Sequence, residues 1–177
     1  KSLANLLKIS STLNRIEIYD NSHFNGTNMI GVMVVSSNLG FEKNQYRKFN
    51  LKNNIRVFKG NDDYGMIEEV FYRRFKKLTN NSEHISPDLI IIDGGKGQVN
   101  IACNVLNSLE IRDVIVIGVS KGKDRNAGRE KIHFSDIKQY IPELIQNSKQ
   151  LNPLILDKNN PVLYFIQRLR DEAHRFA

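Results

Sequence analysis

The sequence predicts an α/β domain in which a mixed five-stranded sheet has helices on both faces. Two observations favour this fold. Three strand patterns come first and are joined by short polar turns, as in an antiparallel meander. Strand and helix patterns then alternate, which is typical of parallel strands joined by crossover helices. The 177 residues are enough for one such domain with a hydrophobic core.

The antiparallel block occupies the first 50 residues. Residues 15–20 alternate along a strand, which places Asp20 on the same face as two isoleucines. Strands are expected at 29–35 and at 41–49, on either side of a polar turn. The strand at 41–49 is rich in charged and amide side chains, which suits an exposed edge of the sheet.

The alternating block begins with apolar residues at helical spacing from Met66 to Leu78. A strand at 88–93, a helix at 97–109 and a strand at 114–119 follow. Both of these strands are apolar on their two faces, as expected for central parallel strands that helices cover.

The C-terminal part is less regular. Residues 136–158 lack a clear period and are expected to form a variable insertion, after a short strand at 132–134 and with a brief helix after Pro142. A last helix starts at the Asn-Pro pair 160–161, which suits an N-cap and a first helical position. We therefore expect residues 1–177 to form a single domain, cut from a longer protein because the chain does not begin with methionine.

Right-handed crossovers place the first and fourth strands side by side and parallel. This is the arrangement of the ribonuclease H-like fold. The two strands end in Asp20 and Asp93, and neighbouring strands lie about 4.8 Å apart. Carboxylate oxygens are the ligands that Mg²⁺ and Mn²⁺ prefer, so the pair predicts a site for one of these metals. Each aspartate alone could instead cap the turn that follows it.

The composition points to a phosphate-containing partner without proving one. The net charge is +7, which suits nucleic acid but also an ordinary lysine-rich surface. The single cysteine excludes an internal disulfide and fits a reducing compartment such as the cytoplasm. No run approaches the roughly 20 apolar residues of a membrane span, so no membrane partner is expected.

Two glycine-containing segments offer contacts for phosphate. The turn at 94–97, with Lys96 inside it, joins a strand to a helix and presents backbone N–H groups. It lacks the spacer and the Ser or Thr of a Walker A loop. A loop at 121–130 follows the last central strand and can neutralise phosphates, although a solvated loop would look similar. Its cationic residues are Lys121, Lys123, Arg125 and Arg129.

Two further residues are ambiguous from spacing alone. His174 lies at the border of the buried face of the last helix. It is either a partly buried helical histidine, which spacing favours, or a group that orients or deprotonates an attacking water. Asp63, at the start of its helix, is either a cap or a residue that faces the metal.

Six stretches of the chain, in order across nearly its whole length, resemble the C-terminal endonuclease domain of the UvrC family of bacterial excision-repair proteins. These stretches are Tyr19–His23, Gln45–Asn50, Gly60–Tyr64, Ile92–Gln98, Lys121–Glu130 and Arg170–Phe176. The resemblance implies a ribonuclease H-like endonuclease that cuts DNA on the 5′ side of a lesion with Mg²⁺ or Mn²⁺.

The family's catalytic set of aspartates and a histidine maps onto Asp20, Asp93 and His174, with Asp63 as a further acidic member. The resemblance also implies damaged double-stranded DNA as substrate and a UvrB–DNA complex as partner of the full-length protein, with this fragment monomeric. Two other classes stay open from the residues alone. One is a catalytically silent DNA-binding module, and the other is a nucleotide-binding enzyme that uses the 94–97 turn.

Overall fold

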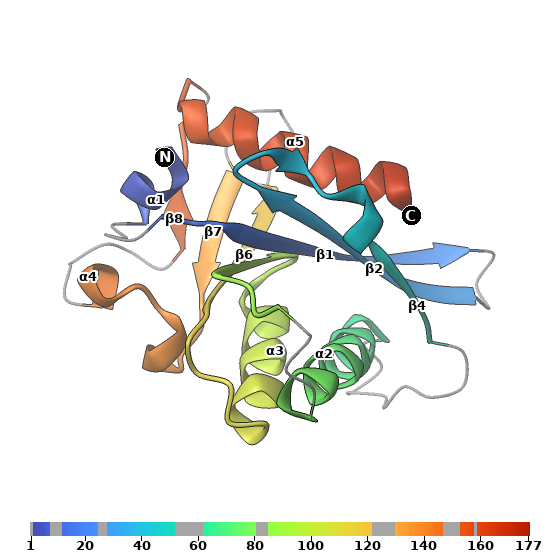
Figure 1. The fold of residues 1–177 in the computed structure, drawn as a ribbon. Coiled ribbons are helices and arrows are strands. Elements are labelled where there is room, and N and C mark those ends of the chain that lie inside the picture. Colours follow the sequence, from blue (N-terminus) through green and yellow to red (C-terminus); the bar gives the residue numbers. More distant parts are fainter. Residues whose placement is uncertain are drawn as a thin grey trace.

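The computed structural model describes residues 2–7, 12–24, 28–51, 62–80, 85–121, 130–146, 153–157 and 159–177. An eight-stranded sheet runs through these residues, with helices packed on both of its faces (Figure 1). The strands are β1 Arg15–Phe24, β2 Asn28–Ser37, β3 Gly40–Phe41, β4 Arg47–Asn50, β5 Leu89–Asp93, β6 Ile115–Lys121, β7 Glu130–Phe134 and β8 Leu154–Ile155. The helices are α1 Ser2–Leu6, α2 Asp62–Asn80, α3 Lys96–Ser108, α4 Glu143–Gln146 and α5 Pro161–Phe176, with 3₁₀ turns η1 Lys43–Gln45 and η2 Lys138–Tyr140.

The sheet has the predicted topology at its centre. Its strand order is β3-β2-β1-β5-β6-β7-β8, and β4 also pairs with β2. β1 is antiparallel to β2 and parallel to β5, which is in turn parallel to β6. The first and fourth predicted strands therefore lie side by side, as the ribonuclease H-like fold requires.

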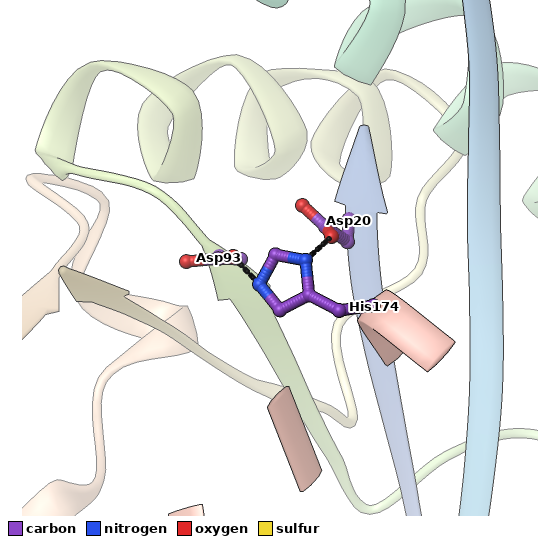
Figure 2. A group of neighbouring side chains, drawn as sticks. All are labelled: Asp20, Asp93 and His174. Atoms are coloured by element: carbon purple, nitrogen blue, oxygen red, sulfur yellow. Dashed lines mark ion pairs between the residues drawn. The ribbon is translucent and has the colours of Figure 1, made fainter. Parts of the chain in front are cut away.

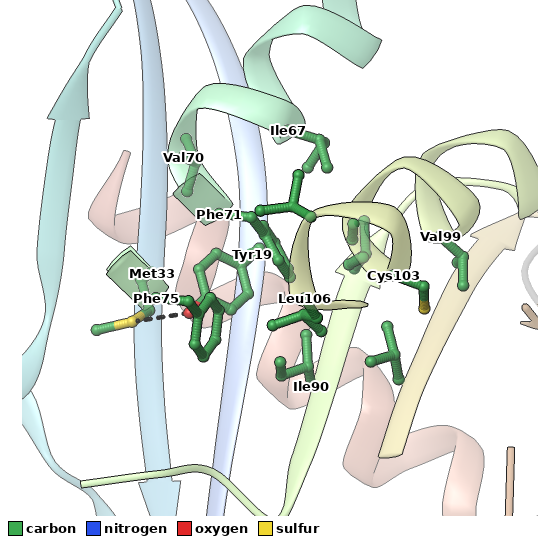
Figure 3. Close-up of a cluster of buried hydrophobic side chains, with 14 of the residues drawn as sticks. Tyr19, Met33, Ile67, Val70, Phe71, Phe75, Ile90, Val99, Cys103 and Leu106 are labelled. Atoms are coloured by element: carbon green, nitrogen blue, oxygen red, sulfur yellow. Dashed lines mark hydrogen bonds between the residues drawn. The ribbon is translucent and has the colours of Figure 1, made fainter. Parts of the chain in front are cut away.

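Alternation along the strands divides the core into two clusters. Tyr19, Ile90 and Ile92 belong to the cluster beneath α2 and α3, part of which Figure 3 shows. Ile18 and Ile91, on the opposite face of the same strands, belong to the cluster beneath α5 and α1. The expectation of helices on both faces is confirmed.

Three details of the predicted sheet are wrong. The strand at 41–49 is divided into β3 and β4 by η1, because residues 42–45 are a polar run without an apolar side chain to bury. Both pieces still pair with β2. β1 continues to Phe24, so Asp20 is not the last residue of its strand. The sheet is also wider than five strands, because β7 and β8 extend it beyond β6.

The helices agree closely with the sequence pattern. The carboxamide of Asn160 accepts a hydrogen bond of 3.0 Å from the Val162 backbone N–H, so α5 begins with the predicted N-cap. The expected helix after Pro142 is α4. Among the α-helices of the described residues, α1 alone was not expected, although Leu3 and Leu7 are both buried at helical spacing. None of the helices in the described ranges is both long and apolar enough to cross a membrane.

Replacing Gly118 with alanine is expected to destabilise the domain by about 1–3 kcal/mol through overpacking. An added Cβ would lie 2.5 Å from the Val99 side chain and 2.7 Å from the Gly94 carbonyl oxygen. The turn after β5 packs on β6 at this point, so the substitution would displace it. Urea denaturation measures the loss, and an unchanged midpoint would contradict the close packing of this turn on β6.

Candidate metal centre

Two aspartates meet where the β1–β5 ladder ends. The last pair of that ladder is Tyr19 with Ile92, so Asp20 and Asp93 are the next residues on the two parallel strands. Beyond this point β1 stays paired with β2, and β5 with β6. Each aspartate comes two residues after a buried isoleucine of the α5 face, so both carboxylates point toward α5.

His174 comes from the last turn of α5 and lies between the two carboxylates (Figure 2). Its Nδ1 is 3.0 Å from Asp20 Oδ2, and its Nε2 is 3.4 Å from Asp93 Oδ2. One potential ligand atom from each of the three residues lies within 4.8 Å of the other two. The Asp20 side chain is only 8% exposed, whereas that of His174 is 58% exposed. The site is therefore anchored in the core and open to solvent on the side of the imidazole.

Arg170 and Glu130 fix the orientation of Asp93. Arg170 Nη2 donates to Asp93 Oδ1 over 3.0 Å, and its Nη1 donates to Glu130 Oε2 over 2.6 Å. Arg170 and Glu130 are both buried, which makes these charge-assisted hydrogen bonds strong. Because Oδ1 of Asp93 accepts from arginine, the other oxygen is the one that faces His174.

Sequence reasoning did not single out this buried pair as part of the site. A signal was present, because Arg170 comes one turn before His174 and four residues after Ile166, at a position that the helical pattern assigns to the core. A charge at a core position requires a partner. Its partner, Glu130, is far away in the sequence, and only the folding of β7 beside β6 brings the two together.

The two carboxylates are brought together at an energetic cost. Burial and the nearby charge of Asp93 raise the pKa of Asp20 to about 6, although His174 acts in the opposite direction. The Asn21 backbone N–H donates to Asp20 Oδ1 over 2.9 Å. A cation between the carboxylates would relieve this repulsion.

The three donors fit Mg²⁺ or Mn²⁺. Carboxylate oxygens suit both hard cations, and they come from two strands that the sheet holds in place. Asp20 and Asp93 would be the ligands, and the imidazole lies close enough to either bind the ion or act on a water beside it.

The metal-free protein is expected to gain stability when Asp20 is replaced with asparagine. The folded-state pKa of Asp20 lies above its usual value, so ionised Asp20 costs stability above about pH 6 and costs nothing below about pH 4. The gain should be on the order of 1–3 kcal/mol near pH 8 and should vanish near pH 4. Chemical denaturation in EDTA at both pH values measures it, with the exposed Asp113→Asn as control. A loss of stability near pH 8 would contradict the repulsion.

Two further residues near the predicted site, Asp63 and His23, are not part of the three-residue group. Asp63 lies in the first turn of α2, and the three-residue group found among the described residues does not include it. The Tyr64 hydroxyl lies against Gly97, so the start of α2 touches the start of α3, just after Asp93. A role for Asp63 at the site stays a prediction. The side chain of His23 lies outside the described part of the structure.

Two of the five predicted phosphate-binding cations are described. Lys96 is exposed and forms an ion pair of 2.7 Å with Asp136, and Lys121 is exposed at the end of β6. The remaining three residues, Lys123, Arg125 and Arg129, lie outside the described residues. Gly95 is the N-cap of α3 and has no side chain that could accept from the first N–H groups of this helix, which begins three residues after Asp93.

Parallel β1 and β5, each with an aspartate beyond their last shared pair and with a C-terminal helix across them, define a ribonuclease H-like domain. Residues 4–177 match the family model described as the UvrC RNAse H endonuclease domain. The chain therefore belongs to the family of UvrC ribonuclease H endonuclease domains. The resemblance seen in the sequence is confirmed.

Curated relatives agree with this family. UvrABC system protein C of Zymomonas mobilis is 44% identical over 100% of this chain, and that of Caulobacter vibrioides is 44% identical over 99%. The chain spans about a quarter of the length of these relatives. The crystal structure of human ENDOV superimposes with a TM-score of 0.50 at 11% identity, covering 93% of this chain and 84% of that one. This likeness supports the fold.

Proposed function

We propose that this domain hydrolyses a DNA phosphodiester on the 5′ side of a lesion during nucleotide excision repair, with Mg²⁺ or Mn²⁺ as cofactor. The observation that carries the proposal is the convergence of Asp20, Asp93 and His174 within 4.8 Å in a chain of the UvrC endonuclease family. The substrate is damaged double-stranded DNA, presented in the cytoplasm as a complex with UvrB to the longer protein of which this domain is part.

Asp20 and Asp93 hold the cation in this proposal. When bound, the cation would polarise the scissile phosphate and lower the pKa of a water molecule. Arg170 keeps Asp93 in one orientation by donating from Nη2 to Asp93 Oδ1. Glu130 accepts from Nη1 of the same guanidinium and so fixes Arg170. Asp63 is the further acidic member, acting from the start of α2 beside the turn that follows Asp93.

His174 orients or deprotonates the attacking water. Its imidazole is more than half exposed, so it can reach a water on the solvent side of the carboxylates. Both ring nitrogens now face a carboxylate oxygen. One of them must leave its carboxylate to accept a proton from water, and the exposed end of α5 leaves room for that movement.

Phosphates are held by Lys96, Lys121, Lys123, Arg125 and Arg129, together with the N–H groups at the start of α3. These contacts position the DNA backbone and carry no base specificity.

An incision assay tests the proposal. A duplex with one lesion, labelled on the damaged strand, is loaded with UvrB and mixed with the full-length protein that contains this domain. All proteins compared in the assay keep the same N-terminal part and differ only in this domain. We expect a nick on the 5′ side that needs Mg²⁺ or Mn²⁺. Tight binding without this nick would instead indicate a catalytically silent DNA-binding module.

Removing the charges of the loop at 121–130 is expected to flatten the salt dependence of DNA binding. Each phosphate contact that is lost lowers the slope of log K against log salt by about 0.9. Replacing Lys121, Lys123, Arg125 and Arg129 with glutamine should therefore reduce the slope by up to about 3.6. Lys138→Gln, at an exposed position on η2, is the control. An unchanged slope in the fourfold variant would place the phosphate contacts elsewhere.

A further inference from the structure

A cationic cavity of about 250 Å³ lies on the face of the sheet opposite the metal centre. Its polar lining residues are Arg15, Gln45, Arg47, Arg74 and Lys77, together with two apolar side chains. Arg15 lies on the same face of β1 as Tyr19, which packs beneath α2, whereas Asp20 faces α5. The cavity is therefore a separate feature that the nuclease centre does not use.

The cavity also accounts for a sequence motif that the metal centre leaves unexplained. The stretch Gln45–Asn50 is one of the six that resemble the UvrC family, yet none of its residues is in the carboxylate–histidine group. Gln45 and Arg47 both line the cavity. The Gln45 carboxamide oxygen accepts a hydrogen bond from Arg15 Nη1, and the Arg47 guanidinium lies 4.7 Å from the centroid of the Phe49 ring.

One buried acid neutralises only part of the positive charge. Glu17 is fully buried, and its Oε2 accepts hydrogen bonds of 2.9 Å from both Arg15 Nε and Arg74 Nη2. Its Oε1 accepts from the Tyr19 hydroxyl over 2.5 Å. In the described part of the chain, no acid pairs with Arg47 or Lys77. Four cations thus share a single carboxylate.

Arg74 adds a buried charge to the wall of the cavity. Its side chain is only 3% exposed, and its Nε and Nη1 have no hydrogen-bond partner among the described residues. Burial and the charge of Arg74 lower the pKa of Arg47. Because buried charges are screened weakly, the repulsion between these two guanidinium groups persists. A bound anion would relieve it.

We propose that this cavity is a binding site for a phosphate group, in addition to the proposed nuclease centre. Guanidinium groups match the oxygen geometry of phosphate and carboxylate alike. Four cations and one carboxylate leave a net charge of +3 around the cavity, which suits free phosphate, with up to two negative charges, better than a singly charged carboxylate. A phosphate of the DNA backbone carries one negative charge, and it shares with free phosphate the oxygen geometry that guanidinium groups bind.

Calorimetric titration with inorganic phosphate in EDTA tests the proposal, since EDTA removes any metal that could bind phosphate at the other site. We expect saturable 1:1 binding that Arg47→Gln and Lys77→Gln each weaken roughly tenfold. Lys76→Gln is the matched control, because Lys76 is the exposed neighbour of Lys77 on α2 and does not line the cavity. Circular dichroism confirms that each variant is folded.

Binding that is absent, or equally strong in Arg47→Gln, Lys77→Gln and Lys76→Gln, would overturn the proposal. A second titration with a short single-stranded oligonucleotide assigns the source of the phosphate. If the DNA backbone is the ligand, Arg47→Gln weakens oligonucleotide binding and inorganic phosphate competes with it. If free phosphate is the ligand, oligonucleotide binding is the same in the wild type and in Arg47→Gln while phosphate binding still falls.

Discussion

Replacing Asp20 with alanine is expected to lower the rate of 5′ incision by on the order of a thousandfold or more, because one of the two carboxylates proposed to hold the cation is lost. Asp20 lies nearly buried, 3.0 Å from His174 and beside Asp93, so no other described acid can replace it. The fold and the affinity for DNA should change little, because the proposed phosphate contacts come from other residues.

The incision assay described above, run with saturating DNA and with Mg²⁺ varied, measures this effect. Asp113→Asn serves as the control, because Asp113 is exposed and belongs to no cluster of ligands found in the described residues. An Asp20→Ala protein that still nicks damaged DNA on the 5′ side at a similar rate would show that the metal centre is assigned to the wrong residues.

Replacing His174 with glutamine is expected to slow incision by about 10²–10⁴-fold, the usual contribution of a general acid or base. Glutamine can still donate to Asp20 but cannot take a proton from water near neutral pH. Metal affinity should change much less than the rate, since the two carboxylates remain. Single-turnover incision measures the rate. Asp171→Asn is the control, because Asp171 is an exposed residue of α5 one turn before His174.

The pH profile separates the role of His174 from that of the carboxylates. Wild-type incision should fall below about pH 6, because protons then compete with the cation for Asp20, whose pKa is raised to about 6 in the metal-free protein. An imidazole that is already protonated also cannot accept a proton from water. In the His174→Gln protein, the remaining activity should depend on pH only through protonation of the carboxylates. A higher metal concentration should therefore restore the activity that this protein loses at low pH. A wild-type rate that is independent of pH, with chemistry rate-limiting, would exclude a proton-accepting role for His174.

Local patterns were sufficient to predict most of the fold. Alternation in β1 and the apolar runs of β5 and β6 identify the central strands, and helical spacing identifies α2, α3 and α5. The division of 41–49 by η1 was missed because a polar run gives no sign of where pairing with β2 resumes. β8 is only two residues long, too short for any period to appear.

Only the part of the site that strand order brings together could be predicted from the residues. Asp20 and Asp93 could be paired because parallel neighbours bring the ends of their ladder to one edge. His174 depended on the resemblance, because its helical position is also compatible with a structural role. The Arg170–Glu130 pair depends on the position of β7 across the sheet, which no local pattern in a single sequence contains.

The proposed nuclease activity depends on a divalent cation between two carboxylates from neighbouring strands. The most direct test is a crystal soaked in Mn²⁺ and measured for anomalous scattering. We predict an anomalous peak bounded by Asp20 and Asp93, with the His174 imidazole displaced from at least one of the two carboxylates. A soaked crystal in which His174 still bridges both aspartates, with no manganese between them, would show that Asp20 and Asp93 do not form a metal site.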